Sequence, residues 1–549
     1  MEDAQRPGRV DPDGIDRRSF LAMGGVAAAA VAGWPLGAGA QTASAWNAGQ
    51  VVHLIPTASH DRVLIKASFR TPLAATPRLV VDGKPVTGTR TDLEARFWRF
   101  DASGLQPATT HELRIVDAGG EPLCDAWPLR TFPAPDAAAE RMRIVAYTCA
   151  GGYDGVVIRG KTGFLAMPAR QRLLERALAF RPDALIANGD HIYWDQLTLL
   201  NKPFAKIAQD EAWSKFGGAL DLSVPMLHPR NAAIFLKVCD YQIPGLYGTS
   251  LRSVPSFFLT DDHDYFENDE FDDKVATLPP DSYGIAGVEQ TQRLYYPEFL
   301  PDANRPAWLP GSELAGLPEG ANIAFGTLRY GRLLEAVLYD CRRYVDYKGA
   351  HAKVVPQWTE DWLVARTRAE DTVHFMHAPS LPFGYSSGKL GDWYPDLLDE
   401  RSGHLILYQE KPGWQRGWLA QHQRLVQALA SQKKRSAVIV EGDFHASAAG
   451  RITRSGEIAL EQPVHTILTG PLGTGDLGFP SAYRGVESRP SQLLDMEQAM
   501  KPVERNGFTV IDVTPERMTF SIFTWRPPQP VEEIDTMRPA LVYSVPRRS

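Results

Sequence analysis

Apolar positions follow a strand-like pattern in the first part of the chain. Between residues 46 and 133, short runs rich in Val, Ile, Phe and Trp are separated by Gly, Pro and Asp, as in RVLIKASF, PRLVVDG, FWRFDASGL and HELRIVDAGG. Such runs, without helical periodicity, are typical of a small antiparallel β-sandwich. The Pro/Ala-rich stretch 131–140 has no apolar periodicity and is predicted to be a linker. The pattern therefore predicts a β domain at 46–134 and a second domain at 141–549.

The second domain shows helices alternating with short apolar strands. Residues 167–182 carry apolar side chains at helical spacing and end at a proline, and residues 418–435 form another amphipathic pattern. Each is followed by a short apolar run, DALIANGD in the first case and SAVIVEGD in the second. This alternation predicts an α/β domain with largely buried sheets.

Six apolar runs of this domain share one property: each ends in charged or metal-binding side chains. In chain order these are Cys149, Asp190 with Tyr193, Asp262 with His263, Asp340 with Arg342, His377, and Asp443 with His445. Ligands of α/β sheets bind at the carboxyl ends of the strands. We therefore expect these side chains to converge on one site.

The residue types indicate metal ions. Carboxylates packed in a partly buried site would lose their charge unless cations held them. An aspartate such as Asp190 can bridge two ions, and Cys149 and Tyr193 favour a transition metal over Mg²⁺ at one position. Such ions generate hydroxide from bound water and polarise a phosphoryl oxygen, while Arg342 would neutralise phosphate oxygens. The run FFLTDDHDYFEND (257–269) by itself fits a solvated acidic loop equally well.

Composition narrows the class of protein. The 549 residues are 44% hydrophobic and 22% charged, with a net charge of −7. These values are ordinary for a folded protein of two or three domains, and no long basic stripe indicates a nucleic-acid partner. The 4 cysteines are far apart and form no CxxC, so a zinc finger has no support.

The first 45 residues have the features of an export signal. Arg17 and Arg18 precede an apolar segment that runs from Phe20 to about Leu36 and is followed by small residues. That segment is short for a membrane span. The order Arg-Arg-Ser-Phe-Leu resembles a twin-arginine signal, with an ordinary export signal as the alternative. We expect recognition by the twin-arginine export machinery and a periplasmic or secreted location.

Several segments together resemble a known family. GDHIYWD, DDHDYFEND, YDCRRY, WQRGW and EGDFH resemble, in order, signature segments of PhoD-like alkaline phosphatases, in the calcineurin-like metallophosphatase superfamily. GLQPATTHELRIV is similar to the end of a fibronectin type III domain. The resemblance implies a four-layer α/β catalytic domain of two mixed β-sheets flanked by helices, preceded by a small all-β, fibronectin-III-like sandwich. It implies hydrolysis of phosphate monoesters and diesters with Fe³⁺ and Ca²⁺ in a multinuclear centre; Zn and Mn are the alternatives.

The resemblance also implies roles for single residues. The implied metal ligands are Cys149, Asp190, Tyr193, Asp262, Asp443 and His445. Asp190 matches the bridging aspartate, and His263 matches a histidine that stabilises or protonates the leaving oxygen. Arg342 matches an arginine whose phosphate role is inferred from its charge alone. His377, in HAPSLP, resembles the His-x-Pro segment of ordinary metallophosphatases and is predicted to be a further ligand.

The sequence departs from the family pattern in four places. His191 replaces a tyrosine, Trp194 replaces a glutamate with Asp195 one position later, and Ala-Gly-Gly follows Cys149. No C-terminal capping helix is predicted, because RPALVYSVPRRS has the pattern of a strand or coil. These departures bear on the metals and the substrate range. Residues 384–400 are predicted to be either a substrate lid or packed surface.

Two other functions fit the same residues. One is a phosphodiesterase or phospholipase-D-like enzyme acting on lipid or polymer diesters. The other is a metal-bound envelope protein that binds a phosphorylated ligand without turnover. Small phosphate esters are the expected substrates of the leading hypothesis.

Overall fold

The computed structural model describes residues 46–154, 157–158, 161–194, 210, 213–266, 280–346, 353–386, 416–475 and 487–548. Asn47–Ser549 form one compact unit, which holds every element named below. The predicted signal (1–45), Asp195 and most of the 384–400 segment lie outside the described residues. No helix of the described part has the length and apolar character that a membrane crossing requires.

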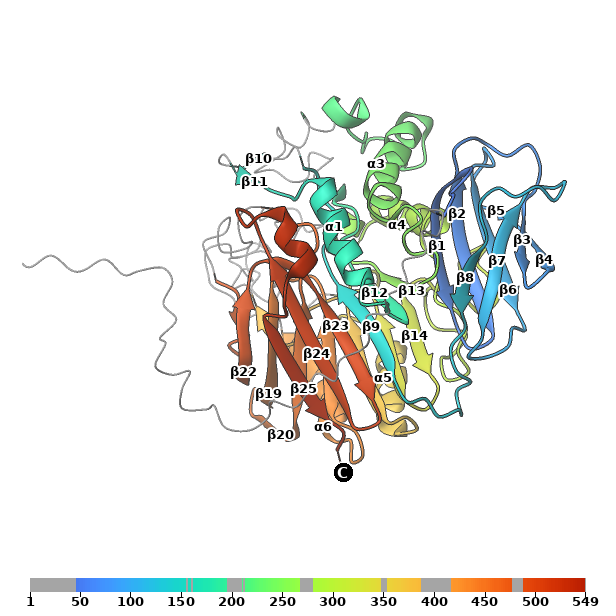
Figure 1. Ribbon diagram of the computed structural model, residues 1–549. Coiled ribbons are helices and arrows are strands. Elements are labelled where there is room, and N and C mark those ends of the chain that lie inside the picture. Colours follow the sequence, from blue (N-terminus) through green and yellow to red (C-terminus); the bar gives the residue numbers. More distant parts are fainter. Residues whose placement is uncertain are drawn as a thin grey trace, which may run out of the picture. The chain divides into compact units, whose positions relative to one another are not determined.

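Residues 51–130 form two four-stranded antiparallel sheets, as predicted for a β-sandwich (Figure 1). The first sheet contains β1 (Val51–Ala58), β2 (Arg62–Phe69), β6 (Phe97–Ser103) and β5 (Thr89–Arg90), in that order. The second contains β4 (Lys84–Thr87), β3 (Arg78–Val81), β7 (Thr110–Val116) and β8 (Trp127–Arg130). The likeness to a fibronectin type III domain stays a prediction, as does the boundary between residues 134 and 141.

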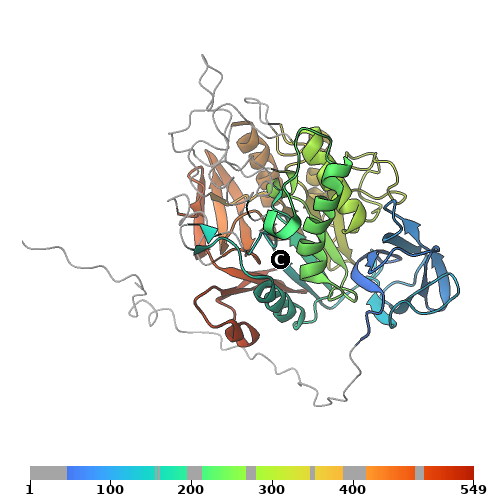
Figure 2. The same ribbon diagram turned by 90° about the horizontal axis from the view of Figure 1, so that it is seen from above.

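The rest of the chain is built around two larger mixed sheets (Figures 1 and 2). The six-stranded sheet has the order β13 (Ser256–Leu259), β12 (Ala184–Asn188), β9 (Met142–Tyr147), β23 (Asn506–Thr514), β24 (Arg517–Trp525) and β25 (Leu541–Pro546). The seven-stranded sheet has the order β14 (Phe325–Tyr330), β15 (Leu334–Tyr339), β16 (His374–Pro379), β18 (Ala437–Glu441), β20 (Ile458–Thr469), β19 (Ser447–Ser455) and β22 (Leu494–Val503). All six apolar runs singled out in the sequence are strands, and the C-terminal strand β25 agrees with the absence of a predicted capping helix.

Helices cover the outer faces of these sheets. The helices are α1 (Met167–Leu178), α3 (Pro229–Tyr247), α4 (Ser282–Leu294), α5 (Gln357–Ala369) and α6 (Arg416–Ala430). Short elements complete the described part: η3 (Asp262–Tyr265), η6 (Val531–Thr536), and two short antiparallel strand pairs, β10 (Val157–Ile158) with β11 (Lys161–Thr162) and β17 (Tyr385–Ser386) with β21 (Arg489–Pro490).

Side-chain alternation along the strands produces three apolar layers. In β9, Val145 packs in a cluster with residues of α1 and α3, whereas Ile144 belongs to a cluster shared by both sheets. In β18, Ile439 packs with residues of α5 and α6, and Val440 joins the same shared cluster. Because successive strand residues point to opposite faces, each sheet is buried on both sides. The order helices, sheet, sheet, helices follows, as the family resemblance implied.

A buried ion pair connects the β-sandwich to the loop after α4. Lys66 of β2 donates to Glu298 Oε1 at 2.7 Å and to the carbonyl of Arg293 at 3.0 Å. The two charged side chains are 0% and 3% exposed. Burial lowers the pKa of Lys66, and Glu298 acts against this by stabilising the ammonium form. The pair therefore ties residues far apart in the sequence into one folded unit.

Replacing Lys66 by Met is expected to lower the free energy of unfolding by about 3–5 kcal/mol, because the variant leaves the Glu298 carboxylate buried without its counter-charge. Urea-induced unfolding monitored by circular dichroism measures the change. The control is Lys433→Met, since the Lys433–Glu461 pair is 67% and 59% exposed and should contribute less than about 1 kcal/mol. Equal losses in the two variants would contradict a stabilising role for the buried pair.

Candidate metal centre

The backbone turns sharply at three of the predicted ligands. Cys149, Asp190 and Asp443 follow β9, β12 and β18, and their φ angles are 48°, 58° and 64°. Positive φ is unfavourable for a residue with a Cβ and persists only where the surrounding structure fixes it, most often at functional sites. The three strands therefore end in the same unusual way, each at a side chain with metal-binding chemistry.

Small residues allow the strand ends to approach one another. A Cβ added to Gly189 would lie 2.5 Å from the Cβ of Asp261, and one added to Gly442 would lie 2.5 Å from the carbonyl oxygen of Asn188. Thr148 connects the sheets, because its hydroxyl donates to the Asn188 carbonyl at 2.6 Å and accepts from the Asp443 N–H at 3.0 Å. The ends of β9, β12 and β18 are thus held together by close backbone approach at the glycines and by the Thr148 hydroxyl.

Three overlapping groups of side chains could each hold an ion. They are Cys149, Asp190 and His445; Asp190, Asp262 and His263; and Asp190, Asp261, Asp262 and Asp443. Within each group the candidate ligand atoms lie within 4.8 Å of one another. Asp190 belongs to all three groups, which is the arrangement expected of a carboxylate that bridges neighbouring ions.

The phenol of Tyr193 lies at the same point. Its hydroxyl donates to Asp190 Oδ2 at 3.2 Å and lies 3.0 Å from His445 Nε2. The Cys149 thiol is 3.3 Å from Asp190 Oδ2. Sulfur, phenol, imidazole and carboxylate donors therefore meet in one buried cluster, and this donor set suits a transition metal.

The charges of the cluster fit cations. Asp190 Oδ1 and Asp261 Oδ2 are buried and have no hydrogen-bond partner among the described residues. Burial, followed by the charge of Asp190, raises the pKa values of Cys149 and Tyr193 well above their ordinary ranges. Burial also raises the pKa of Asp261, with Arg342 acting against it. Bound cations would satisfy the unpartnered oxygens and stabilise the deprotonated donors.

Arg342 lies inside the cluster, but its contacts are with acids. Its Nε donates to Asp261 Oδ1 at 2.7 Å and its Nη2 donates to Asp443 Oδ2 at 3.0 Å, and the side chain is fully buried. Asp340, at the end of β15, fixes this geometry by accepting the backbone N–H groups of Arg342 and Arg343 at 2.7 and 3.0 Å. Two of its three nitrogen atoms thus contact carboxylates, through which its charge acts on the site, and its role toward phosphate stays a prediction.

Asp264 supports the loop that carries Asp190. Its carboxylate accepts backbone N–H groups from Asp190, His191, Ile192 and Asp261, all at 3.0 Å. Burial and the charge of Asp190 raise the pKa of Asp264 to about 8, while the backbone donors act against this rise. The sequence placed Asp264 in the acidic run but gave no sign of this supporting role.

A buried arginine supports the loop after Cys149. Arg170 of α1 donates to the carbonyls of Leu165, Ala150 and Gly152 at 2.7, 3.2 and 2.9 Å. Its side chain is fully buried. The helical pattern of 167–182 predicted that Arg170 lies in a helix but did not indicate this supporting role.

His377 does not join the cluster, and its prediction as a metal ligand is wrong. Its Nδ1 lies 3.0 Å from the Tyr339 hydroxyl and its Nε2 lies 2.9 Å from Thr367 Oγ1. Thr367 belongs to α5, so the ring points toward that helix from within β16. Burial lowers the pKa of His377 to about 3, which keeps the imidazole neutral. It is a core histidine that joins a strand to the helix covering it.

His191 and Trp194 also have structural roles. His191 Nε2 donates to the Leu259 carbonyl at 2.6 Å, and its ring packs against Phe258 and Tyr296. Trp194 stacks between the rings of Phe235 and Phe266, with centroids 5.1 and 5.4 Å away. The two side chains that depart from the family pattern at these positions therefore pack in the core beside the metal centre.

His263 occupies the more exposed side of the cluster. It lies in η3 (Asp262–Tyr265), a 3₁₀ turn that begins directly after Asp261, and its ring packs on Tyr193 with centroids 4.0 Å apart. It is half-buried, whereas Asp261 and Asp262, which directly precede it, are buried. Its position beside the ligands suits a group that meets substrate.

Comparisons with known proteins agree with this geometry. A family model described as PhoD-like phosphatase matches residues 247–522. A solved structure titled "Structure of PhoD" is similar over 87% of both chains, with 15% identity and a TM-score of 0.58. A purple acid phosphatase, PPD1 from yellow lupin (Lupinus luteus) seeds, is similar over 91% of this chain and 75% of its own, with 12% identity and a TM-score of 0.51. No curated protein matches the chain.

The fold and the site define a metallophosphatase enzyme. The family match covers half of the chain, and both structural neighbours are similar to it in fold. The chain belongs to the PhoD-like phosphatase family.

Proposed function

We propose that this protein is an exported metal-dependent phosphohydrolase that cleaves phosphate monoesters, diesters or both. The observation that carries the proposal is the sharing of Asp190 by all three candidate ligand groups. One carboxylate in three overlapping groups suits adjacent ions that act on one phosphate. Export through the twin-arginine pathway to the periplasm or beyond rests on the sequence of residues 1–45 alone.

The donor atoms divide into a softer and a harder set. Cys149, Tyr193 and His445 surround one side of Asp190, and the carboxylates of Asp261, Asp262 and Asp443 surround another. The first set favours a transition metal such as Fe³⁺, with Zn or Mn as alternatives, and the second favours a hard cation such as Ca²⁺. Elemental analysis of the purified protein tests this division.

The residues then have separate tasks. Bound ions would lower the pKa of water and polarise the phosphoryl oxygen. The Asp264 carboxylate holds Asp190 in place by accepting its backbone N–H, and Arg342 offsets the charge of Asp261 and Asp443. His263, on the more exposed side, stabilises or protonates the leaving oxygen.

Removing the metals is expected to lower the rate of p-nitrophenyl phosphate hydrolysis by at least about 100-fold, since the ions would supply the nucleophile and several kcal/mol of charge stabilisation. The rate is measured after treatment with a chelator and again after metals are restored. A sample dialysed without chelator is the control. Full activity in protein that elemental analysis shows to be metal-free would overturn the proposal.

The ratio of rates on p-nitrophenyl phosphate and bis(p-nitrophenyl) phosphate separates the substrate classes. A faster rate on the diester would favour the phosphodiesterase or phospholipase-D-like alternative. Phosphate binding without turnover, in metal-replete protein, would favour the non-catalytic binding protein.

A further inference from the structure

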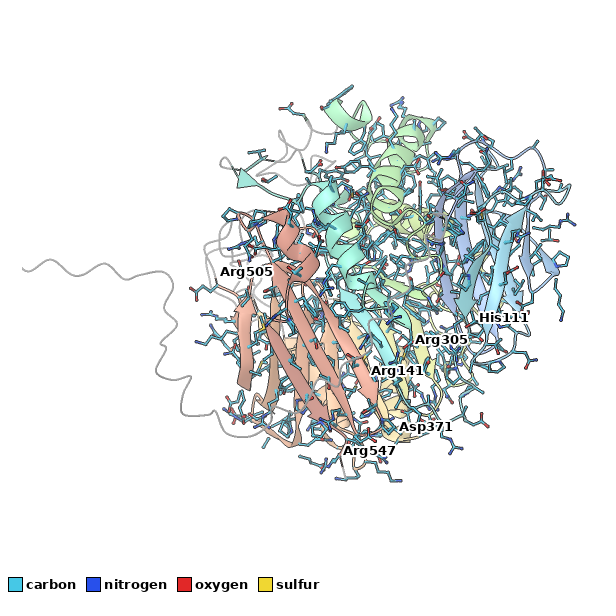
Figure 3. All side chains as sticks on the ribbon, in the orientation of Figure 1. His111, Arg141, Arg305, Asp371, Arg505 and Arg547 are labelled. Carbon is cyan, nitrogen blue, oxygen red and sulfur yellow. The ribbon has the colours of Figure 1, made fainter. Side chains whose placement is uncertain are left out.

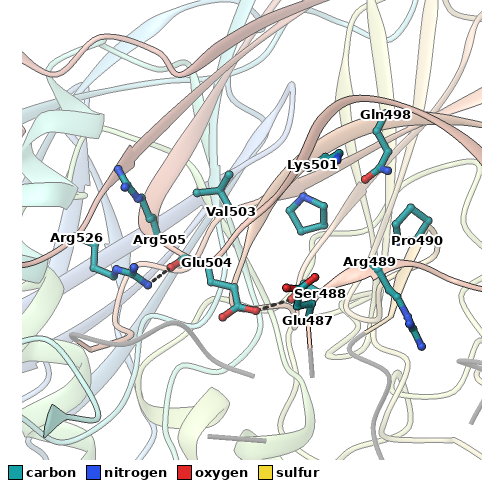
Figure 4. Close-up of a pocket in the computed structure, with 11 residues that line it drawn as sticks. Glu487, Ser488, Arg489, Pro490, Gln498, Lys501, Val503, Glu504, Arg505 and Arg526 are labelled. Atoms are coloured by element: carbon teal, nitrogen blue, oxygen red, sulfur yellow. Dashed lines mark hydrogen bonds between the residues drawn. The ribbon is translucent and has the colours of Figure 1, made fainter. Parts of the chain in front are cut away.

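A polar cavity lies at the end of the seven-stranded sheet, outside the ligand groups described above. Its volume is about 520 Å³, and Figure 4 shows the residues that line it. They come from three segments: residues 487–490 around β21, residues 498–505 at the end of β22, and Arg526 after β24. A cavity of this size accommodates a small organic ligand.

The cavity lies at the same end of the sheets as the metal centre. Val503, in its lining, pairs with Ser447 of β19, which is two residues after His445. His445 is two residues from Ser447 along the chain, and Ser447 lies one strand spacing from Val503. The Cα atoms of His445 and Val503 are therefore at most about 12 Å apart. Figure 3 shows Arg505, another lining residue, near the upper ends of the C-terminal strands and Arg547, which follows β25, near their lower ends.

The lining carries an excess of positive charge although the chain as a whole is acidic. The basic lining residues are Arg489, Lys501, Arg505 and Arg526, against the acids Glu487 and Glu504. The Glu504 carboxylate accepts the Ser488 hydroxyl at 3.0 Å, and Arg526 Nη1 donates to the backbone carbonyl of Glu504 at 2.8 Å. These contacts fix the walls of the cavity.

Two of the cations have their charges available. Lys501 and Arg505 are exposed, and their side chains make no ion pair or hydrogen bond with any residue that the structure describes. Elsewhere on the same sheet, Arg451 pairs with Glu497 and Arg454 pairs with Asp495. Among the described residues, Lys501 and Arg505 thus differ from the paired arginines at the other end of β22.

We infer that this cavity binds a second phosphate group of an extended phosphate-ester substrate, while the first phosphate is at the metal centre. The inference rests on the proposed function and names its substrate class: esters that carry two phosphate groups on one scaffold, close enough for one to reach the cavity while the other is at the metal centre. Guanidinium and ammonium groups are suited to phosphate oxygens, the arginine by paired hydrogen bonds and the lysine as a point charge. Bisphosphates are thereby favoured over monophosphates of the same scaffold.

The test compares fructose 1,6-bisphosphate with fructose 6-phosphate, by release of orthophosphate, in the full-length protein loaded with metal. The variant is Lys501→Ala/Arg505→Ala. For it, kcat/KM for the bisphosphate is expected to fall about tenfold, mostly through KM, because two exposed charge contacts contribute about 0.7 kcal/mol each. The value for fructose 6-phosphate is expected to change less than about twofold. Arg451→Ala/Arg454→Ala, which removes the same charge from paired positions on β19, is the control and should leave both values unchanged.

Equal losses on the two substrates, or a loss equal to that of the control variant, would overturn the inference. If the wild-type protein hydrolyses no ester, the proposed function fails, and calorimetric binding of fructose 1,6-bisphosphate tests the cavity by itself. Weaker binding by Lys501→Ala/Arg505→Ala than by wild type would then support the anion site, and equal binding would refute it.

Discussion

Replacing Asp190 by Asn is expected to lower kcat/KM for p-nitrophenyl phosphate by at least about 10³-fold and to reduce the metal content of the purified protein. The carboxylate belongs to all three candidate ligand groups, so the neutral amide weakens every one of them. Loss of a single preorganised electrostatic contact already lowers rates by about 10²–10³-fold, and a bridging ligand contributes to more than one ion.

Asp190→Asn is a conservative substitution, so a loss of activity reports on the carboxylate charge. Asn keeps the size of the side chain and can retain the contact with the Tyr193 hydroxyl. Asp495→Asn is the matched control, because Asp495 pairs with Arg454 at the end of β22 far from Val503; its rate should stay within about twofold of wild type. Wild-type turnover with full metal content in Asp190→Asn would remove the bridging role and the mechanism built on it.

The positions of the strands could be predicted from the sequence because each strand corresponds to one short, continuous run of apolar residues. Each short apolar run bounded by polar residues is a strand in the structure, and the rule that ligands lie at carboxyl ends brought Cys149, Asp190 and Asp443 together correctly. These three residues lie within a few positions of the ends of β9, β12 and β18. No contact between distant residues had to be known for that prediction.

The sequence could not show which of several adjacent aspartates face the metal centre. Asp261, Asp262 and Asp264 follow one strand, and a 3₁₀ turn sets which way each points. Asp261 and Asp262 face the ligand groups, while Asp264 turns toward the backbone of residues 190–192. The turn depends on packing against the β12 loop, which is a contact between distant segments.

His377 shows a different reason for failure. It lies two positions inside β16 rather than after it. On that strand Phe375 packs in the cluster that contains residues of α5, and Met376 packs between the sheets. The period of two along a strand puts His377 on the same face as Phe375. That face packs toward α5, away from the strand end, and the sequence does not reveal it because Phe375 and Met376 are both apolar.

Replacing His263 by Gln is expected to lower kcat by about 10²–10⁴-fold for an alkyl phosphate such as β-glycerophosphate, the range typical of lost general acid catalysis. An alkoxide leaves poorly unless it is protonated or stabilised as the bond to phosphorus breaks. For p-nitrophenyl phosphate the expected loss is below about tenfold, because the phenolate is stable without a proton. The half-buried ring beside Tyr193 is placed to meet the substrate at this point.

The comparison of the two leaving groups separates two roles for His263, since its ring nitrogen also lies near Asp190 and Asp262. A residue that mainly holds an ion would reduce both rates equally and would lower the metal content measured by elemental analysis. A residue that acts on the leaving oxygen would reduce only the alkyl phosphate rate and leave the metal content intact. His465→Gln, in β20 with its ring bonded to Tyr543, is the control for loss of a histidine. Equal losses on both substrates with full metal content would exclude the leaving-group role, because an acid that protonates the departing oxygen must matter most for the more basic one.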